Sequence, residues 1–320
     1  MQILFRHLTT LRQGQTKFGL APHKPVLLLA VVEGFEKGYL NSPEITISEE
    51  LLTNFYDIWK LLVTTRNIPD FSLPFFHLGT EKSGIWQLQP WPGVTIPVTK
   101  SNSIKSFKAL RNTVQFARIS DEFYRALMDP LQREEIKQIL LERYFPDTAY
   151  RLMDKRIDRF SETVKKEILY EPDVNYARKV IRHFESITTE EREEEITLRN
   201  HIFRKAVWEK YDHRCAISGM KIETPNRVSM VDACHIIPFA QSHDDTISNG
   251  IALSPTFHRA FDHGLIAITN DYTIAVNKRI TDHSLSNGLM EYHGKPIILP
   301  TERAFYPSIQ KLEQQRERFS

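Results

Sequence analysis

The spacing of apolar residues divides the chain into a helix-rich N-terminal part and a C-terminal part that mixes short strands with helices. Apolar residues recur three to four positions apart over much of the first 145 residues, which predicts helices. The predicted helices cover residues 1–15, 25–37, 49–62, 104–114, 121–129 and 133–145. Alternation over residues 84–88 predicts a strand. Residues 151–200 are highly charged but keep helical spacing.

The C-terminal part has short apolar runs separated by turn-forming residues. Residues 228–234 and 250–253 are predicted strands, and residues 255–263 a short helix. Ser254 is a favourable N-cap, Pro255 suits the first helical position, and Gly264 suits the C-terminal stop. A hairpin over residues 265–276, a late strand over 294–300 and a helix over 311–319 complete the prediction. We therefore expect an α+β fold.

Three parts are expected from these patterns: a mixed helical and β domain over residues 1–148, a charged helical linker over 149–197, and a second domain over 198–320. The acidic stretch 188–195 is predicted to be a solvated helix start or part of the linker. Two domains also fit the length of 320 residues.

Composition and charge indicate an ordinary globular protein. Hydrophobic residues make up 41% of the chain and charged residues 26%, and the net charge is only +2. Such a balance does not by itself indicate nucleic-acid binding. Two cysteines, Cys215 and Cys234, cannot form a four-cysteine zinc site and give no disulfide framework. No apolar run has the length of a membrane span or a signal peptide, so we expect a cytoplasmic protein with no membrane partner.

Three polar residues of the C-terminal part have the spacing of a hydrolytic site. His235 ends a predicted strand, Asn249 follows fourteen residues later, and His258 nine residues after that on the predicted helix. Asp262 lies four residues beyond His258 and therefore on the same helix face. Two imidazoles at separate points, with a carboxylate beside the second, suit one general base and one metal ion.

Residues 203–277 resemble the HNH nuclease motif, the ββα-metal fold. The resemblance includes the lead-in YDHRCAISG at 211–219 and the segment FDHGLI at 261–266. It implies that His235 is the general base, a role that suits histidine because the reference pKa of an imidazole lies near neutrality. It also implies that Asn249 braces the loop after His235, and that His258 and Asp262 hold a cation that stabilises the charged transition state.

One position departs from the HNH pattern. Many members carry an acidic or imidazole ligand directly before the first histidine, where this chain has Cys234. Asp232 lies two residues earlier, on the same face of the predicted strand, and is expected to supply charge there as a further ligand. This donor set suits one divalent ion, and Mg²⁺, Mn²⁺, Ni²⁺ and Zn²⁺ all remain open.

The N-terminal part is similar to the DNA sulfur-binding domain of McrA-like, modification-dependent restriction enzymes. The similarity rests on HKP at residues 23–25, PFFHL at 74–78, GIWQL at 84–88 and the helix that ends in YF at 144–145. That domain binds phosphorothioated DNA backbones with a small apolar cup and basic neighbours. The resemblance implies that His23 and Lys24 approach the DNA backbone.

The predicted cup also departs from its family. Pro74 is expected to line the cup, with an aromatic residue before it and a small residue three positions after it. Here those positions hold Leu73 and His77. His77 would either abolish selectivity for sulfur or adapt the pocket to another modification. The alternative interpretation is that His23 and Lys24 only cap a helix and that the two phenylalanines after Pro74 belong to the core.

Together the two resemblances imply a metal-dependent endonuclease that restricts modified double-stranded DNA, phosphorothioated DNA being one candidate. Because the chain has one such motif and restriction needs both strands cut, a homodimer is expected. Two alternatives stay open: an HNH nuclease of repair or mobile elements that nicks DNA, and a DNA-binding protein with an inactive nuclease fold. The intact set of His235, Asn249 and His258 argues against the inactive form.

Overall fold

The computed structural model describes residues 2–317 except 97–103, 105, 153, 155–156, 223–228, 282 and 284–287. It contains two compact units. Unit 1 comprises Met1–Thr163 and Ile187–Leu198, and unit 2 comprises Val164–Ser186 and Arg199–Ser320. Helices and small antiparallel sheets occur in both, which confirms the α+β prediction. The range predicted as a linker, 149–197, is divided between the two units because its helices pack on either one or the other.

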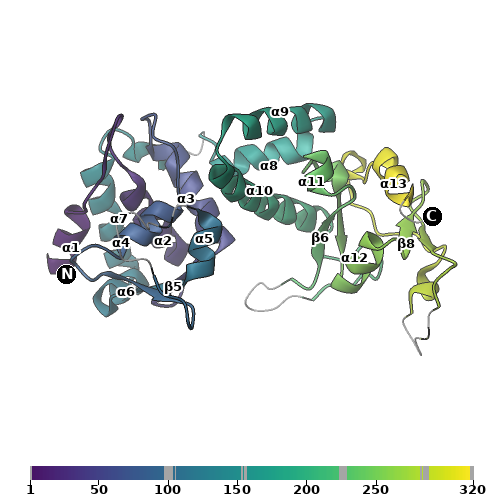
Figure 1. The fold of residues 1–320 in the computed structure, drawn as a ribbon, viewed down its shortest axis with the longest axis horizontal. Coiled ribbons are helices and arrows are strands. Elements are labelled where there is room, and N and C mark those ends of the chain that lie inside the picture. The colour runs from purple at the N-terminus through teal and green to yellow at the C-terminus, as the bar shows by residue number, and fades with distance from the viewer. Residues whose placement is uncertain are drawn as a thin grey trace. The chain divides into compact units, whose positions relative to one another are not determined.

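Unit 1 is built around helix α2 (His23–Glu36), which lies among the other helices of this unit (Figure 1). Every residue of α2 from Pro25 to Phe35 is buried, as expected for a helix that is apolar on all sides. The helices that pack against it are α3 (Glu49–Leu62), α4 (Ser72–Leu78), α6 (Asp121–Met128) and α7 (Pro130–Tyr144). Helix α1 (Gln2–Thr9) packs on α7, and α5 (Phe107–Thr113) packs on α4.

The sheet of unit 1 has three antiparallel strands in the order β3 (Glu44–Thr46), β5 (Val114–Ile119) and β4 (Trp86–Pro90). The predicted strand at residues 84–88 is therefore confirmed, whereas β5 had been missed. Helix α1 is shorter than predicted, because the chain turns at residues 10–14 into the hairpin of β1 (Gln15–Thr16) and β2 (Gly19–Leu20).

The charged middle of the chain forms the short helix η2 (Ala149–Leu152) and then α8 (Phe160–Tyr170), α9 (Asp173–Ser186) and α10 (Thr189–Lys210). A capping box starts α10. The Glu191 N–H donates to Thr188 Oγ1 at 3.2 Å, and the Thr188 N–H donates to Glu191 Oε2 at 2.7 Å. The acidic stretch is thus the first turns of α10, whose later residues belong to unit 2.

Unit 2 holds two strands and a helix in the predicted order. Strand β6 (Asp232–His235) pairs antiparallel with β7 (Gly250–Leu253), and α12 (Pro255–Asp262) packs against both. Strand β6 begins later than the predicted 228–234, of which residue 228 lies outside the described residues. Between the strands lie α11 (Phe239–Ser242) and the short helix η3 (Ile247–Asn249).

The remainder of unit 2 follows α12. The predicted hairpin is confirmed as β8 (Ile266–Ile268) and β9 (Ile274–Val276). The predicted strand at 294–300 is wrong, because this segment makes a single bridge, between Thr273 and Pro296, and its two prolines cannot donate ladder hydrogen bonds. The last elements are η4 (Leu289–Tyr292), η5 (Arg303–Phe305) and α13 (Ile309–Arg316). Within the described parts of the chain, every helix is too short or too polar to cross a bilayer.

Candidate active site

His235 lies at the end of β6, with its ring held from two sides. Its Nε2 lies 2.8 Å from Oδ1 of Asp245, a carboxylate that is completely buried. The ring also stacks on Phe203 of α10, with 4.0 Å between centroids and an interplanar angle of 9°. Because a carboxylate only accepts hydrogen bonds, the contact favours the tautomer with its proton on Nε2. The lone pair on Nδ1 is then suited to take a proton from water.

Asn249 is completely buried at the end of the loop that follows His235. Its Oδ1 accepts from the Ile237 N–H at 2.9 Å. Its Nδ2 donates to the carbonyl oxygens of Ile237, at 2.9 Å, and Asp244, at 2.8 Å. The amide therefore joins both ends of the loop. One of its partners, Asp244, directly precedes Asp245, whose carboxylate contacts His235. Asn249 makes these contacts with backbone groups and has no part on the surface.

Gly250 allows α10 to approach the strands closely. It pairs with His235 in the sheet register. A Cβ atom at Gly250 would lie 2.6 Å from Val207 Cγ2 and 3.1 Å from Phe203 Cε2. Both of these residues lie on α10, and Phe203 is the ring that stacks on His235. The missing side chain at residue 250 thus sets the position of the aromatic ring that stacks on His235.

His258 lies between two carboxylates. Its Nδ1 is 3.1 Å from Asp232 Oδ2, which comes from β6, and its Nε2 is 3.3 Å from Asp262 Oδ2, one turn later on α12. All three side chains are partly exposed. The structure therefore brings together the three residues predicted as metal ligands.

The donor atoms of this cluster suit a divalent cation, since imidazole and carboxylate are common ligands for such ions. In the structure the two carboxylates contact opposite nitrogens of the His258 ring, so the three groups do not converge on one point. Consistent with this, the described residues contain no group of three His, Cys, Asp or Glu side chains arranged to hold a metal. A cation at His258 would replace one carboxylate at its ring nitrogen, and the other would keep its hydrogen bond and orient the ring.

Cys234, the residue directly before His235, is buried rather than part of this cluster. Burial, followed by the nearby charge of Asp262, raises the pKa of its thiol well above the ordinary value. The thiol therefore stays protonated, and a protonated thiol is a poor metal ligand. Asp232 is the residue of β6 that faces His258.

The residues predicted to contact DNA lie at the start of α2 and on α4 in unit 1. His23 and Lys24 are the first two residues of α2, rather than preceding it. His23 Nε2 lies 2.9 Å from the Ile68 carbonyl oxygen, and its ring lies 4.6 Å from that of Trp59. Burial lowers the pKa of His23, so its ring is neutral at neutral pH. Lys24 forms an ion pair with Glu81, in which both side chains are largely buried.

Pro74 and His77 lie on α4, which packs directly against α2. Pro74 is buried and His77 is partly exposed. Burial, and then the charge of Lys24, lower the pKa of His77. Phe75 and Phe76 are core residues, as the alternative interpretation of this block had it.

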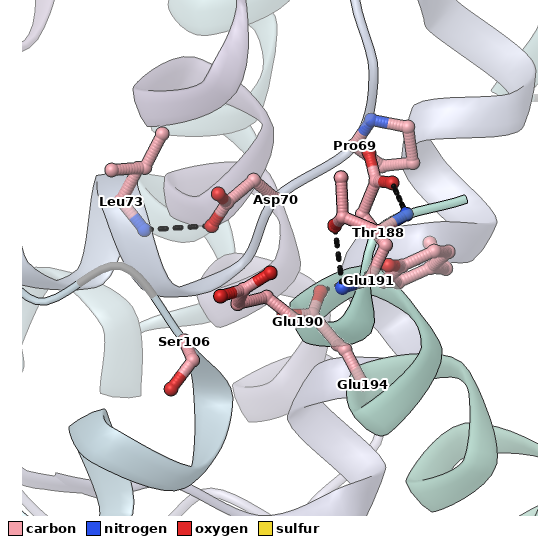
Figure 2. A pocket seen from close by; sticks show the side chains of 9 residues that line it. Pro69, Asp70, Leu73, Ser106, Thr188, Glu190, Glu191 and Glu194 are labelled. Atoms are coloured by element: carbon pink, nitrogen blue, oxygen red, sulfur yellow. Dashed lines mark hydrogen bonds between the residues drawn. The ribbon is translucent and has the colours of Figure 1, made fainter.

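A cavity of about 440 Å³ in unit 1 is lined by Leu73 of α4 and by residues of the first turns of α10 (Figure 2). Four of the side chains that line it are acidic: Asp70, Glu190, Glu191 and Glu194. Burial, and then the charge of Asp70, raise the pKa of Glu194 to about 8. An anionic DNA backbone would be repelled by the other carboxylates, so this cavity is not suited to hold it.

Comparison with known families gives one match in the C-terminal part of the chain and one in the N-terminal part. Residues 215–269 match the HNH endonuclease family, and residues 1–156 match the ScoMcrA-like, DNA sulfur-binding domain. Residues 215–269 therefore form a domain of the HNH endonuclease type. Residues 1–156 form a domain of the DNA sulfur-binding type, so both resemblances found in the sequence are confirmed. HNH domains generally use a divalent metal ion.

Two solved structures similar to this endonuclease are both restriction enzymes. One is the modification-dependent TagI restriction endonuclease, with 23% identity over 36% of each chain and a TM-score of 0.27. The other is the type IV phosphorothioation-dependent restriction endonuclease ScoMcrA, with 12% identity over 80% of this chain and 93% of that one, and a TM-score of 0.34. The endonuclease thus spans about a third of TagI. A search of curated proteins found no match.

Two residues of the endonuclease site had not been predicted from the sequence. Asp245 contacts His235, and Lys311 of α13 holds the same loop from another side. The Lys311 ammonium is paired with Asp244 and lies 2.9 Å from Ser248 Oγ and 3.2 Å from Asp173 Oδ2. In the sequence Asp244 and Asp245 stand in a polar loop with no spacing signal. A carboxylate between the two motif residues His235 and Asn249 was the one available hint.

Proposed function

We propose that this endonuclease restricts DNA that carries a backbone modification, phosphorothioate first among the candidates. One observation supports this target above others: the chain that holds His235 also holds, over residues 1–156, a domain of the sulfur-binding type. The TagI and ScoMcrA enzymes are modification-dependent and phosphorothioation-dependent restriction endonucleases, respectively. In this proposal residues 1–148 select the DNA, residues 198–320 cut it, and 149–197 connect the two. Both cysteines are free and buried, which suits a cytoplasmic protein.

In the proposed mechanism, His235 is the general base. Asp245 holds Nε2 of the ring, so Nδ1 takes the proton of the attacking water, and the imidazolium that forms is stabilised by the buried carboxylate. Phe203 prevents the ring from rotating out of this position. Asn249 does not contact the substrate; it fixes the loop that carries Asp245.

His258, with Asp232 or Asp262, would hold one divalent cation. When bound, the cation supplies charge that stabilises the phosphoryl oxygens and the leaving 3′ oxygen. The side chains beside it have two functions of their own. Asp232 and Asp262 give the site negative charge that attracts a cation, and the carboxylate that stays on the His258 ring fixes which nitrogen is free.

In the proposed recognition cup, Pro74 and the neutral rings of His23 and His77 surround a weakly hydrated sulfur, and Lys24 contacts the adjacent phosphate. Lys24 is already paired with Glu81, so its ammonium has to contact the DNA phosphate while it shares its charge with the Glu81 carboxylate. A large ring at residue 77 narrows the cup, so the accepted modification is expected to be small.

Cleavage of matched plasmids tests the function. Unmodified, phosphorothioated and base-modified DNA are incubated with the enzyme and Mn²⁺ or Mg²⁺. We expect cutting of phosphorothioated DNA only, and a His235→Ala rate about 100- to 10,000-fold lower, the usual size for a lost acid–base group. Equal cutting of all three substrates would remove modification dependence, and wild-type cutting by His235→Ala would remove its role as base.

A second assay tests the cup separately from the catalytic site. Lys24→Ala is expected to weaken binding to phosphorothioated duplex and to reduce its salt dependence, since one phosphate contact is lost. Lys82→Ala is the matched control, because Lys82 is an exposed lysine of the same unit with the same change in charge. Equal affinities of the two variants would place backbone recognition outside the start of α2.

A further inference from the structure

A chain of buried polar groups lies behind the general base and extends beyond the HNH motif. Asp245 Oδ1 contacts His235, and Asp245 Oδ2 accepts a hydrogen bond from the Tyr176 hydroxyl at 3.3 Å. The Tyr176 oxygen in turn accepts from Nη1 of Arg199 at 3.1 Å, and this nitrogen lies 4.0 Å from Glu167 Oε2. All of these residues belong to unit 2.

The outer members of this chain come from helices that the HNH family match does not include. Glu167 lies on α8, Tyr176 on α9 and Arg199 on α10, whereas the match covers residues 215–269. Tyr176 and Asp245 are completely buried, and Arg199 is nearly so. None of the three can touch DNA, so an effect of Tyr176 or Arg199 on cleavage has to act through Asp245.

The direction of each hydrogen bond follows from the chemistry of the groups. Burial, and then the charge of Asp245, raise the pKa of Tyr176 above its ordinary value, so its hydroxyl stays protonated and donates to the carboxylate. Arg199 can only donate, so it polarises the Tyr176 hydroxyl and strengthens its bond to Asp245. The positive charge also offsets the cost of burying Asp245 as an anion.

We propose that Tyr176 and Arg199 are positioning residues for cleavage: they fix the Asp245 carboxylate, and Asp245 then fixes the orientation and tautomer of His235. A carboxylate held at one oxygen can turn about its side-chain bonds, whereas one held at both cannot. The helices α8 to α10 are therefore a functional support of the active site in addition to connecting the two units. The inference rests on His235 acting as the general base.

Tyr176→Phe in the full-length enzyme tests the proposal, since it removes one oxygen and keeps the ring. Single-turnover cleavage is expected to fall about 10- to 100-fold, the usual cost of losing a group that orients a catalytic ligand or base. The Kd for DNA should stay unchanged. Tyr170→Phe is the matched control, because Tyr170 lies on α8 with its side chain exposed.

Two further measurements separate positioning from general damage. In ¹⁵N-histidine spectra, the His235 signals, assigned by their loss in His235→Ala, should show Nε2–H in the wild type and a tautomer mixture in Tyr176→Phe. Arg199→Lys should retain most of the rate, and Arg199→Met should lose it. If Tyr176→Phe does not fold, the two Arg199 variants test the proposal through the same measurements: single-turnover cleavage, the Kd for DNA and the His235 tautomer.

Wild-type cleavage and an unchanged tautomer in Tyr176→Phe would overturn the proposal, as would equal rates of the two Arg199 variants. Combined loss of rate and DNA affinity in a folded Tyr176→Phe would overturn it as well, because the hydroxyl would then have a general structural role. Failure of the general-base assignment itself would be recognised separately, by wild-type cleavage in His235→Ala.

Discussion

Replacement of Asn249 by alanine removes three hydrogen bonds from a fully buried position. The groups left behind are the N–H and carbonyl of Ile237 and the carbonyl of Asp244. A typical intramolecular hydrogen bond contributes roughly 1 kcal/mol, and an unpaired buried group costs about 1–3 kcal/mol. We therefore expect Asn249→Ala to lower the free energy of unfolding by about 3 kcal/mol or more. With an m-value of about 2 kcal/mol per M, the urea midpoint of the nuclease transition shifts by about 1.5 M.

Urea titration followed by circular dichroism, together with single-turnover cleavage below the transition, measures both effects. Cleavage should fall in the folded variant too, because the loop that Asn249 braces carries Asp245. Asn249→Asp should be as harmful, since a carboxylate cannot donate to the two carbonyl oxygens. Asn270→Ala, at an exposed position whose amide bonds only with the side chains of Glu313 and Arg316, serves as a control with a change below about 1 kcal/mol. An unchanged urea midpoint in Asn249→Ala, or wild-type stability and cleavage in Asn249→Asp, would refute the role of Asn249 in holding the loop.

Four other outcomes are expected. EDTA should abolish cleavage, and calorimetry should show weaker Mn²⁺ binding by His258→Ala; equal affinity would remove His258 from the ligands. The pKa of Glu194 rises to about 8 on folding, so the folded protein keeps a proton that the unfolded chain releases above about pH 4.5. The urea midpoint of unit 1 should therefore fall as the pH rises from 5 to 8. Glu194→Gln should remove most of this pH dependence. The control Glu190→Gln, at an exposed position, should not change the pH dependence. Gly250→Ala should destabilise the nuclease by roughly 1–3 kcal/mol through overpacking and reduce cleavage, as urea titration and single-turnover assays would reveal; a fully active, equally stable variant would contradict the close approach of α10. Light scattering with DNA should give a homodimer that linearises plasmid, and a strict monomer that only nicks would favour a nicking nuclease.

The sequence predicted the strands and the helix around the candidate site well, because these elements depend on neighbours in the chain. Strand β7 and helix α12 follow from a short apolar run and from Ser254, Pro255 and Gly264, and their spacing places His258 and Asp262 on one face. The late strand was mispredicted for a related reason. Residues 294–300 are apolar enough to form a strand, but the two prolines cannot donate, and the backbone bonds of the segment are divided between residues 272–274 and Ala216, which leaves one bridge. Whether an apolar run becomes a strand depends on what it pairs with, and local sequence does not contain that information.

The support of the general base depends on contacts that sequence spacing cannot reveal. Asp245 is ten residues from His235, but its other partner, Tyr176, is 69 residues away, and Arg199 is 23 residues beyond Tyr176. In the sequence, Tyr176 looks like an ordinary apolar position of one charged helix, and Arg199 looks like a solvated position of another. Only the structure shows that both are buried in unit 2. Burying an arginine and an aspartate is costly unless each is paired, and here the Tyr176 hydroxyl links the two. Here the group at the end of the chain is the imidazole that ends β6, and this gives the charged helices before the HNH motif a role in cleavage as well as in connection.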